Sequence, residues 1–201
     1  MFLKNKLISL LLFTIISTTS FSQTDFTKQR LIAEKHILQL HDSSVLIVRL
    51  QTKEKSIEAL IKAGNTKTAE KIKLEQQKLN QQIINAFNEN FTFCKVYFMY
   101  SNQSLHILNQ EYSKIIFLNN DLQEDSSIKP NFSSCYVAEF GVVASATMIQ
   151  GLAIMDKNLN QLEKPFPYYA KNPFFASKSK FTFKTVKRFN SNLHNYYKSV
   201  K

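Results

Sequence analysis

The fold of this chain is decided between Ser44 and Ser101, where two apolar runs, VLIVRL at 45–50 and FCKVYFMY at 93–100, flank a long polar segment. Both runs are short and rich in β-branched or aromatic side chains, which is typical of buried strands. The segment between them has helical spacing and no proline. Two buried strands joined through a helix form a βαβ unit, the start of a parallel sheet. The sequence therefore predicts an α/β protein.

The connecting segment predicts two helices in succession. The first begins at Thr52, and Ile57, Leu60 and Ile61 form a short apolar face. Gly64-Asn65 predicts its end, because glycine adopts the left-handed conformation without a Cβ clash. The second helix restarts at Thr66 or Thr68 and runs to about residue 90. Its apolar stripe consists of Ala69, Ile72, Leu79, Ile83, Ala86 and Phe87.

The remaining elements alternate between helices and strands. Apolar spacing predicts helices over 23–42, 101–108 and from Phe183 to Tyr197, and strands over 114–118, 136–144 and 151–155. Prolines at 165, 167 and 173 disfavour regular structure between the last strand and the last helix. We expect a three-layer α/β sandwich with a mainly parallel sheet of about five strands, and a mixed sheet stays open as an alternative. A late hairpin followed by a terminal helix resembles the thioredoxin-like layout, although the chain has no CxxC motif.

The first 22 residues have the pattern of a signal peptide. Lys4 and Lys6 form a positive n-region, and residues 7–16 form an apolar h-region. Ser20-Phe21-Ser22 is a small-x-small cleavage site that would leave Gln23 as the new N-terminus. The apolar run is too short for a membrane anchor, and no later run is long enough to span a bilayer. We therefore expect export to the periplasm or the medium of a bacterial cell.

Positive charge is concentrated at the C-terminal end. The chain has a formal net charge of +11, but residues 23–163 carry 15 basic and 15 acidic side chains. Residues 164–201 carry eight lysines, one arginine and no acidic residue. We accordingly divide the mature chain into an α/β domain at 23–163 and a basic, aromatic segment at 164–201 that ends in a helix and packs on the same domain.

The basic segment interleaves cations with aromatic rings, a composition that attracts polyanions. The candidate contact residues are Lys178, Lys180, Lys184, Lys187 and Arg188. Nucleic acid is not expected outside the cytoplasm, so lipid headgroups, lipopolysaccharide or acidic glycans are the better partners. Two alternatives stay open. The terminal helix docks its aromatics into the core and leaves the lysines in water, or the basicity only follows from an AT-rich genome, which enriches lysine and asparagine in proteins generally.

The two cysteines, Cys94 and Cys135, allow two interpretations. In an exported protein they suggest one disulfide, and otherwise they are buried thiols that behave as small apolar groups. A catalytic thiol has little support, because no histidine stands in a recognisable pattern with either. The four histidines lack metal-ligand spacing, and the three glycines form no phosphate-binding loop. We therefore predict neither a metal nor a cofactor.

Arg49 and Glu139 are the unusual residues, because each interrupts an apolar strand. They either pair across the sheet or lie at solvated strand ends, and strand-end positions favour solvation. Ligands of parallel α/β sheets bind beyond the carboxyl ends of the strands. The residues expected there, as a site for a small polar or anionic ligand, are Arg49, Ser101, Asn102, Ser104, Asn119, Asn120 and Glu139. Ordinary loop chemistry and helix capping are the alternative for this group.

These observations favour an exported, non-enzymatic domain that binds a partner in the cell envelope. A thioredoxin-like or other α/β enzyme without a recognisable motif is one alternative. A structural subunit that assembles through its long crossover helix is another. The sequence does not define the oligomeric state.

Overall fold

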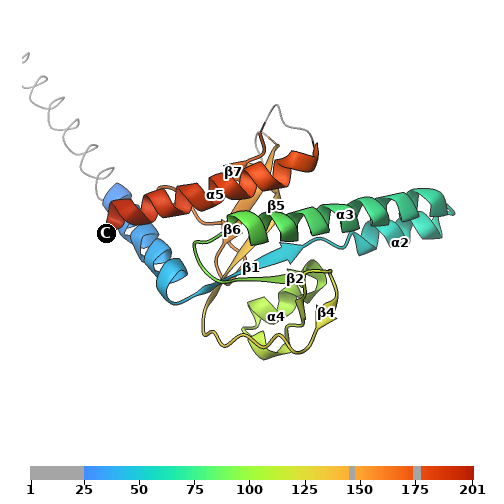
Figure 1. Cartoon of the computed structure of the whole chain (residues 1–201), viewed down its shortest axis with the longest axis horizontal. Coiled ribbons are helices and arrows are strands. Elements are labelled where there is room, and N and C mark those ends of the chain that lie inside the picture. Colours follow the sequence, from blue (N-terminus) through green and yellow to red (C-terminus); the bar gives the residue numbers. More distant parts are fainter. Residues whose placement is uncertain (1–24, 145–147, 174–177) are drawn as a thin grey trace, which may run out of the picture.

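The computed structural model describes residues 25–144, 148–173 and 178–201, and shows an α/β fold with a seven-stranded mixed sheet (Figure 1). The strands are β1 (Val45–Leu50), β2 (Val96–Tyr100), β3 (Phe117–Leu118), β4 (Glu124–Asp125), β5 (Cys135–Ala144), β6 (Ile149–Met155) and β7 (Tyr169–Lys171). The helices are an N-terminal helix described over 25–42, α2 (Glu54–Lys62), α3 (Thr66–Asn90), α4 (Ser104–Leu108) and α5 (Lys178–Val200). The predicted signal peptide and Gln23 lie outside the described residues.

Strand β1 occupies the centre of the sheet, whose order is β4-β3-β2-β1-β5-β6-β7. It pairs in parallel with β2 on one side and with β5 on the other. The predicted βαβ unit is therefore present, because the chain passes from β1 through α2 and α3 into the neighbouring β2.

The expectation of a mainly parallel sheet of about five strands is wrong. Four of the six strand pairings are antiparallel: β2 with β3, β3 with β4, β5 with β6, and β6 with β7. A parallel connection needs a crossover long enough to carry the chain back along the strand. The connection from β2 to β3 contains only the five-residue helix α4 and two 3₁₀ turns, so β3 returns in the opposite direction.

One face of the sheet packs against three helices. The N-terminal helix, α3 and α5 bury Ile37, Phe87 and Phe189 in a core shared with Leu46 and Val48 of β1. Helices α3 and α5 pack beside each other over this face (Figure 1). The aromatic ring of Phe87 lies 5.3 Å from that of Phe91 and 6.1 Å from that of Phe98, measured between centroids.

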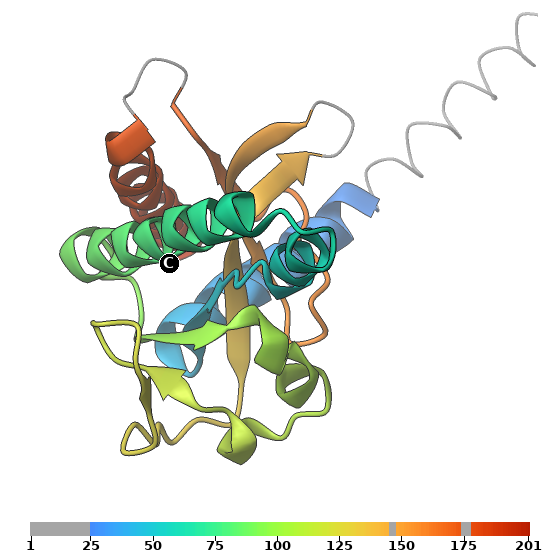
Figure 2. The same cartoon turned by 90° about the vertical axis from the view of Figure 1, so that its right-hand side faces the viewer.

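The opposite face has a thinner cover. Side chains of alternate strand residues point to opposite faces, so Val45 and Ile47 lie here with Met99 of β2. Ile107 of α4 and Ile115, which follows the second 3₁₀ turn, bury them. In Figure 2, α4 lies across the strands from α3 and α5.

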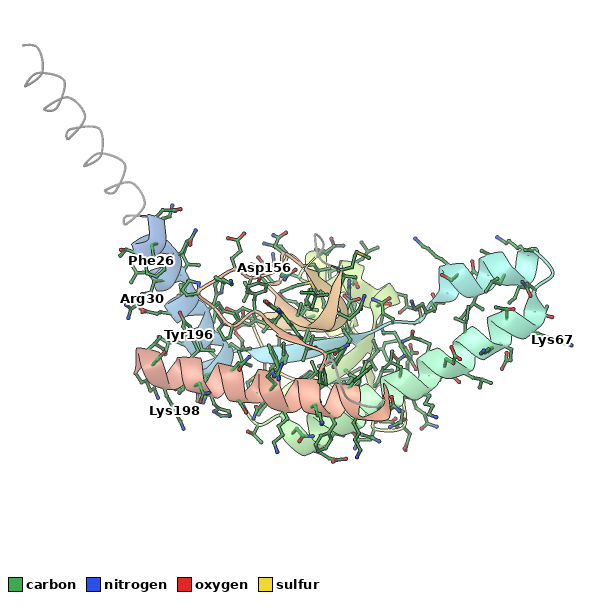
Figure 3. The ribbon with its side chains drawn as sticks, turned by 90° about the horizontal axis from the view of Figure 1, so that it is seen from above. Phe26, Arg30, Lys67, Asp156, Tyr196 and Lys198 are labelled. Atoms are coloured by element: carbon green, nitrogen blue, oxygen red, sulfur yellow. The ribbon has the colours of Figure 1, made fainter. Side chains whose placement is uncertain are left out.

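Helices α2 and α3 form a hairpin that projects from the body of the protein. Figure 3 shows Lys67 near its tip, at the opposite end from Phe26 and Lys198. Gly64 ends α2 as predicted, with φ of 75°. The amide of Gly64 donates to the Ile61 carbonyl at 3.0 Å and that of Asn65 to the Leu60 carbonyl at 2.8 Å, which is a Schellman cap. The apolar face predicted for α2 is not part of the core, because α2 buries no residue, Leu60 is only partly buried, and the helix packs mainly against α3.

The C-terminal segment belongs to the same core and sheet. Strand β7 pairs with β6 although prolines flank it, so the expectation of irregular structure there is wrong. Helix α5 buries Val186, Phe189 and Leu193 and leaves its described lysines, Lys180, Lys184, Lys187 and Lys198, in water. The interpretation in which this helix docks its apolar side is therefore confirmed. No helix in the described ranges is both long and apolar enough to cross a bilayer.

The buried face of α3 makes a testable prediction. We expect Phe87→Ala to lower the free energy of unfolding by about 3–5 kcal/mol, because Phe87 is 1% exposed and its removal leaves a cavity. Leu74→Ala, on the same helix but 56% exposed, is the control and should change it by less than about 0.5 kcal/mol. Chemical denaturation of both variants measures the difference, and equal effects would contradict the packing described here.

Candidate functional site

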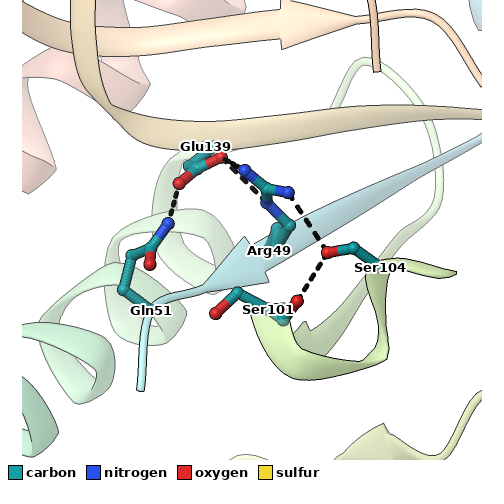
Figure 4. A network of polar contacts seen from close by, with 5 residues as sticks. All are labelled: Arg49, Gln51, Ser101, Ser104 and Glu139. Carbon is teal, nitrogen blue, oxygen red and sulfur yellow. Dashed lines mark hydrogen bonds and ion pairs between the residues drawn. The ribbon is translucent and has the colours of Figure 1, made fainter. Parts of the chain in front are cut away.

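The candidate site lies where the connections from β1 and β5 leave the sheet in opposite directions. After β1 the chain turns towards β2, and after β5 it turns towards β6 on the other side. Such a point opens a crevice beyond the carboxyl ends of the two strands, and in α/β sheets ligands bind there. The structure brings Arg49 and Glu139 together at this point (Figure 4).

Arg49 and Glu139 form an ion pair, so the solvated alternative is wrong. Parallel pairing of Val48 with Ala138 places the next residues of β1 and β5 side by side. Arg49 donates to one Glu139 carboxylate oxygen through Nη2 and, at 2.8 Å, through Nε. Gln51 donates its side-chain amide to the other carboxylate oxygen. The Arg49 and Glu139 side chains are 20% and 16% exposed, which is little for charged groups.

Ser104 at the start of α4 completes this network. Its hydroxyl accepts a hydrogen bond from Nη1 of Arg49 at 3.1 Å and donates to the Ser101 carbonyl at 2.6 Å. The Arg49 guanidinium thus has partners on β5 and α4. The Glu139 carboxylate has partners in Arg49 of β1 and in Gln51, which follows that strand. A buried ion pair is tolerated when further hydrogen bonds satisfy its remaining donors and acceptors, as they do here.

A cleft of about 830 Å³ opens beside this network. Its walls come from the end of β1, from α3, from the β5–β6 hairpin and from the first described turn of α5. Arg49 and Gln51 line it at the end of β1, Gln76 and Asn80 line the α3 wall, and Phe181 lines the α5 wall. The cleft therefore joins both sides of the switch point.

Gln76 and Asn80 are polar residues that the sequence argument missed. Asn80 is 3% exposed and Gln76 is 9% exposed, so the buried stripe of α3 runs through them and not through Leu79. Gln76 donates its amide to Asn80 Oδ1 at 2.9 Å, and Asn80 donates to the Gln51 carbonyl at 2.9 Å. The available signal was their spacing: positions 69, 72, 76, 80, 83 and 87 form one helical stripe that two amides interrupt.

Of the other residues predicted for this edge, two lie near the network. Ser101 contributes its carbonyl to Ser104, as described above. Asn102 is exposed and donates to the Glu54 carboxylate at 3.3 Å, beside a smaller cleft of about 420 Å³ that it lines with Gln51, Gln76 and Asn80.

Asn119 and Asn120 are not part of the site. They form the turn between β3 and β4, which lies away from Arg49 because β3 runs antiparallel to β2. Oδ1 of Asn119 accepts the amides of Asp121 and Gln123, and Oδ1 of Asn120 accepts a hydrogen bond from Asn88 of α3. For these two residues the alternative of ordinary turn chemistry is confirmed.

Both cysteines are free thiols, so of the two interpretations the structure shows buried thiols and not a disulfide. Cys94 packs with the core beneath the three helices, whereas Cys135 packs with the core on the opposite face of the sheet. The sheet separates the two sulfur atoms, and a bond between them would require rearrangement of the backbone. Burial raises the pKa of Cys94 to about 12 and that of Cys135 to about 11.

Helix α5 presents a second candidate surface on its outer side. Lys180, Lys184, Lys187 and Arg188 follow one another at helical spacing and are exposed, and Phe183 lies among them at 39% exposure. No ion pair joins any of these four cations to a carboxylate in the described part of the chain. The side chain of Lys178, the fifth predicted contact, lies outside the described residues.

A comparison with known protein families, curated proteins and solved structures finds no match to this chain. The geometry of the two surfaces is therefore the basis for the function. Among the described residues, no three His, Cys, Asp or Glu side chains gather as a metal site.

Removing one half of the ion pair tests its structural role. We expect Glu139→Leu to lower the free energy of unfolding by about 3 kcal/mol, because the partly buried Arg49 is left without its counter-charge. Adding Arg49→Met should recover much of this loss, since an apolar pair of similar volume replaces a buried ion pair at little cost. Glu34→Leu removes a carboxylate from the i,i+4 pair with Arg30, whose side chain is 62% exposed, and should cost at most about 0.5 kcal/mol. A Glu139→Leu effect as small as this control would contradict a buried pair.

Thiol labelling tests the burial of the cysteines. The thiolate is the reactive form, and a raised pKa keeps both thiols protonated at neutral pH. We expect negligible reaction with Ellman's reagent in the folded protein and rapid reaction of both thiols in guanidinium chloride. Fast labelling of a single native cysteine would overturn this description and favour a reactive thiol.

Proposed function

We propose that this protein is an exported, non-enzymatic binding protein of the bacterial envelope that attaches to an anionic surface through the outer side of α5. The observation that carries the proposal is the exposed row of Lys180, Lys184, Lys187 and Arg188, none of which pairs with a carboxylate among the residues that the structure describes. The export pattern of residues 1–22 supports the compartment, where phosphate-bearing and carboxylate-bearing surfaces are abundant.

Two features of the interior favour binding over catalysis. The thiols are buried on opposite faces of the sheet, so they do not provide the paired cysteines that a thioredoxin-like activity needs. The charges of Arg49 and Glu139 are engaged with each other, and the buried polar residues on the α3 wall of the neighbouring cleft, Gln76 and Asn80, are amides, which bind ligands but do not titrate.

Vesicle binding tests the role of α5. We expect the protein to sediment with phosphatidylglycerol vesicles at low salt and to be released as salt rises, because exposed charges are screened within about 8–10 Å at ordinary ionic strength. Replacing Lys180, Lys184, Lys187 and Arg188 together by Gln should weaken binding at least about tenfold, since each basic side chain near an anionic surface contributes about 1 kcal/mol. The free energy of unfolding should change little.

The α2–α3 hairpin offers the matched control. Lys55, Lys62, Lys67 and Lys71 are also exposed, and replacing them by Gln removes the same charge from a different part of the surface. Equal losses in the two variants would mean that only net charge matters, and no binding at low salt would sink the proposal. Parallel measurements with lipopolysaccharide and with polygalacturonate distinguish the source of the anionic groups.

A second candidate function is assembly through the α2–α3 hairpin. It is favoured by Ile61 and Leu74, which are 52% and 56% exposed on helices that project from the core. Periodic apolar residues on a projecting helix suit a partner helix. Molar mass in solution separates a self-assembling subunit from a monomeric binding protein.

A further inference from the structure

The cleft at the end of β1 and beside the β5–β6 hairpin is lined by six side-chain amides. They come from the end of β1, from α3, from β6 and from the residue after β7: Gln51, Gln76, Asn80, Gln82, Gln150 and Asn172. Its volume of about 830 Å³ lies within the range of small-molecule sites. It occupies the topological switch point, where α/β sheets bind ligands.

Some of these amides are held in place and others are free. Gln76 and Asn80 are bonded to each other and to the Gln51 carbonyl, so their wall of the cleft is ordered before any ligand enters. In the described part of the chain, the side-chain amides of Gln82 and Gln150 have no hydrogen-bond partner, and both line the cleft. The cleft thus combines a rigid polar wall with amides available to a ligand.

The amides match a ligand that both donates and accepts hydrogen bonds. An amide side chain offers two donors and one acceptor group, and a hydroxyl likewise donates and accepts. A carboxylate or phosphate only accepts, and it would favour unpaired cations. Arg49 is already neutralised by Glu139, and the other charges in the lining, Lys53, Lys78 and Glu75, are exposed side chains with a net charge of only +1. Because six amides outnumber these charges, the lining favours a neutral, hydroxyl-rich molecule.

Two aromatic rings complete the cleft. Phe140 and Phe181 both line it and are only partly buried. A sugar ring has an apolar face of C–H groups that packs on an aromatic ring while its hydroxyls bind polar groups at the edge. We infer that this cleft binds a short neutral oligosaccharide, with Phe181 as a packing surface and Gln82 and Gln150 as hydrogen-bonding residues. This inference does not depend on the attachment of α5 to an anionic surface.

Calorimetric titration tests the inference with neutral di- to tetrasaccharides of glucose, galactose, mannose and N-acetylglucosamine. We expect at least one to bind with a Kd that salt hardly changes. Phe181→Ala and Gln82→Ala should each raise that Kd by about fivefold to tenfold, through loss of ring packing and of a hydrogen bond. Phe183→Ala is the matched control, because Phe183 lies on the same helix but outside the cleft. Gln82→Ala keeps the test valid if Phe181→Ala proves unstable.

Three results would overturn the inference. These are no binding by any neutral sugar, equal binding by the Phe181→Ala and Phe183→Ala proteins, or binding of oligogalacturonate alone with loss at high salt. The variant with four Gln replacements on α5 separates the two proposals, since it should lose vesicle binding and retain sugar binding. Failure of one experiment therefore leaves the other intact.

Discussion

The enclosure of β1, at both edges by strands and on both faces by side chains, is the constraint on which the structure depends. This strand is paired on both edges and covered on both faces, so a charge within it must find its partner inside the protein. The parallel register with β5 supplies that partner by placing Glu139 beside Arg49. Gln51 and Ser104 then complete the hydrogen bonds. A shift of one residue between β1 and β5 would leave Arg49 and Glu139 without their partners, so the ion pair also opposes a change of register.

Much of the central fold was predictable because it depends on local signals. The apolar runs at 45–50 and 93–100 identify the two parallel strands, and Gly64 identifies the break between α2 and α3. The antiparallel flanks were not predictable from these signals, because strand direction depends on how far a connection carries the chain. Strands β4 and β7 have two and three residues, too few for a periodic pattern.

The site was predictable only in part, for a related reason. Position beyond a strand end pointed to Arg49, Ser101 and Asn102, but it misplaced Asn119 and Asn120 once β3 reversed direction. Gln76 and Asn80 belong to a helix whose other buried positions are apolar, so the stripe predicted from apolar residues alone did not include them. Their burial follows from the tertiary neighbour, the Gln51 carbonyl, which no local pattern reveals. The cysteines show the same limit, since only the topology places them on opposite faces.

Helix α2 has a consequence for the motions of the protein. It buries no side chain and packs mainly against α3, with one hydrogen bond from Asn102 to Glu54, so its detachment would expose little apolar surface and break no strand pairing. Segments of this kind open at low free-energy cost, well below that of global unfolding. Lys53, which precedes α2, lines the larger cleft, and Glu54, Ile57 and Glu58 of α2 line the smaller one. Helix α2, which buries no side chain, therefore borders both clefts. Its local opening would change access to them while the core stays intact.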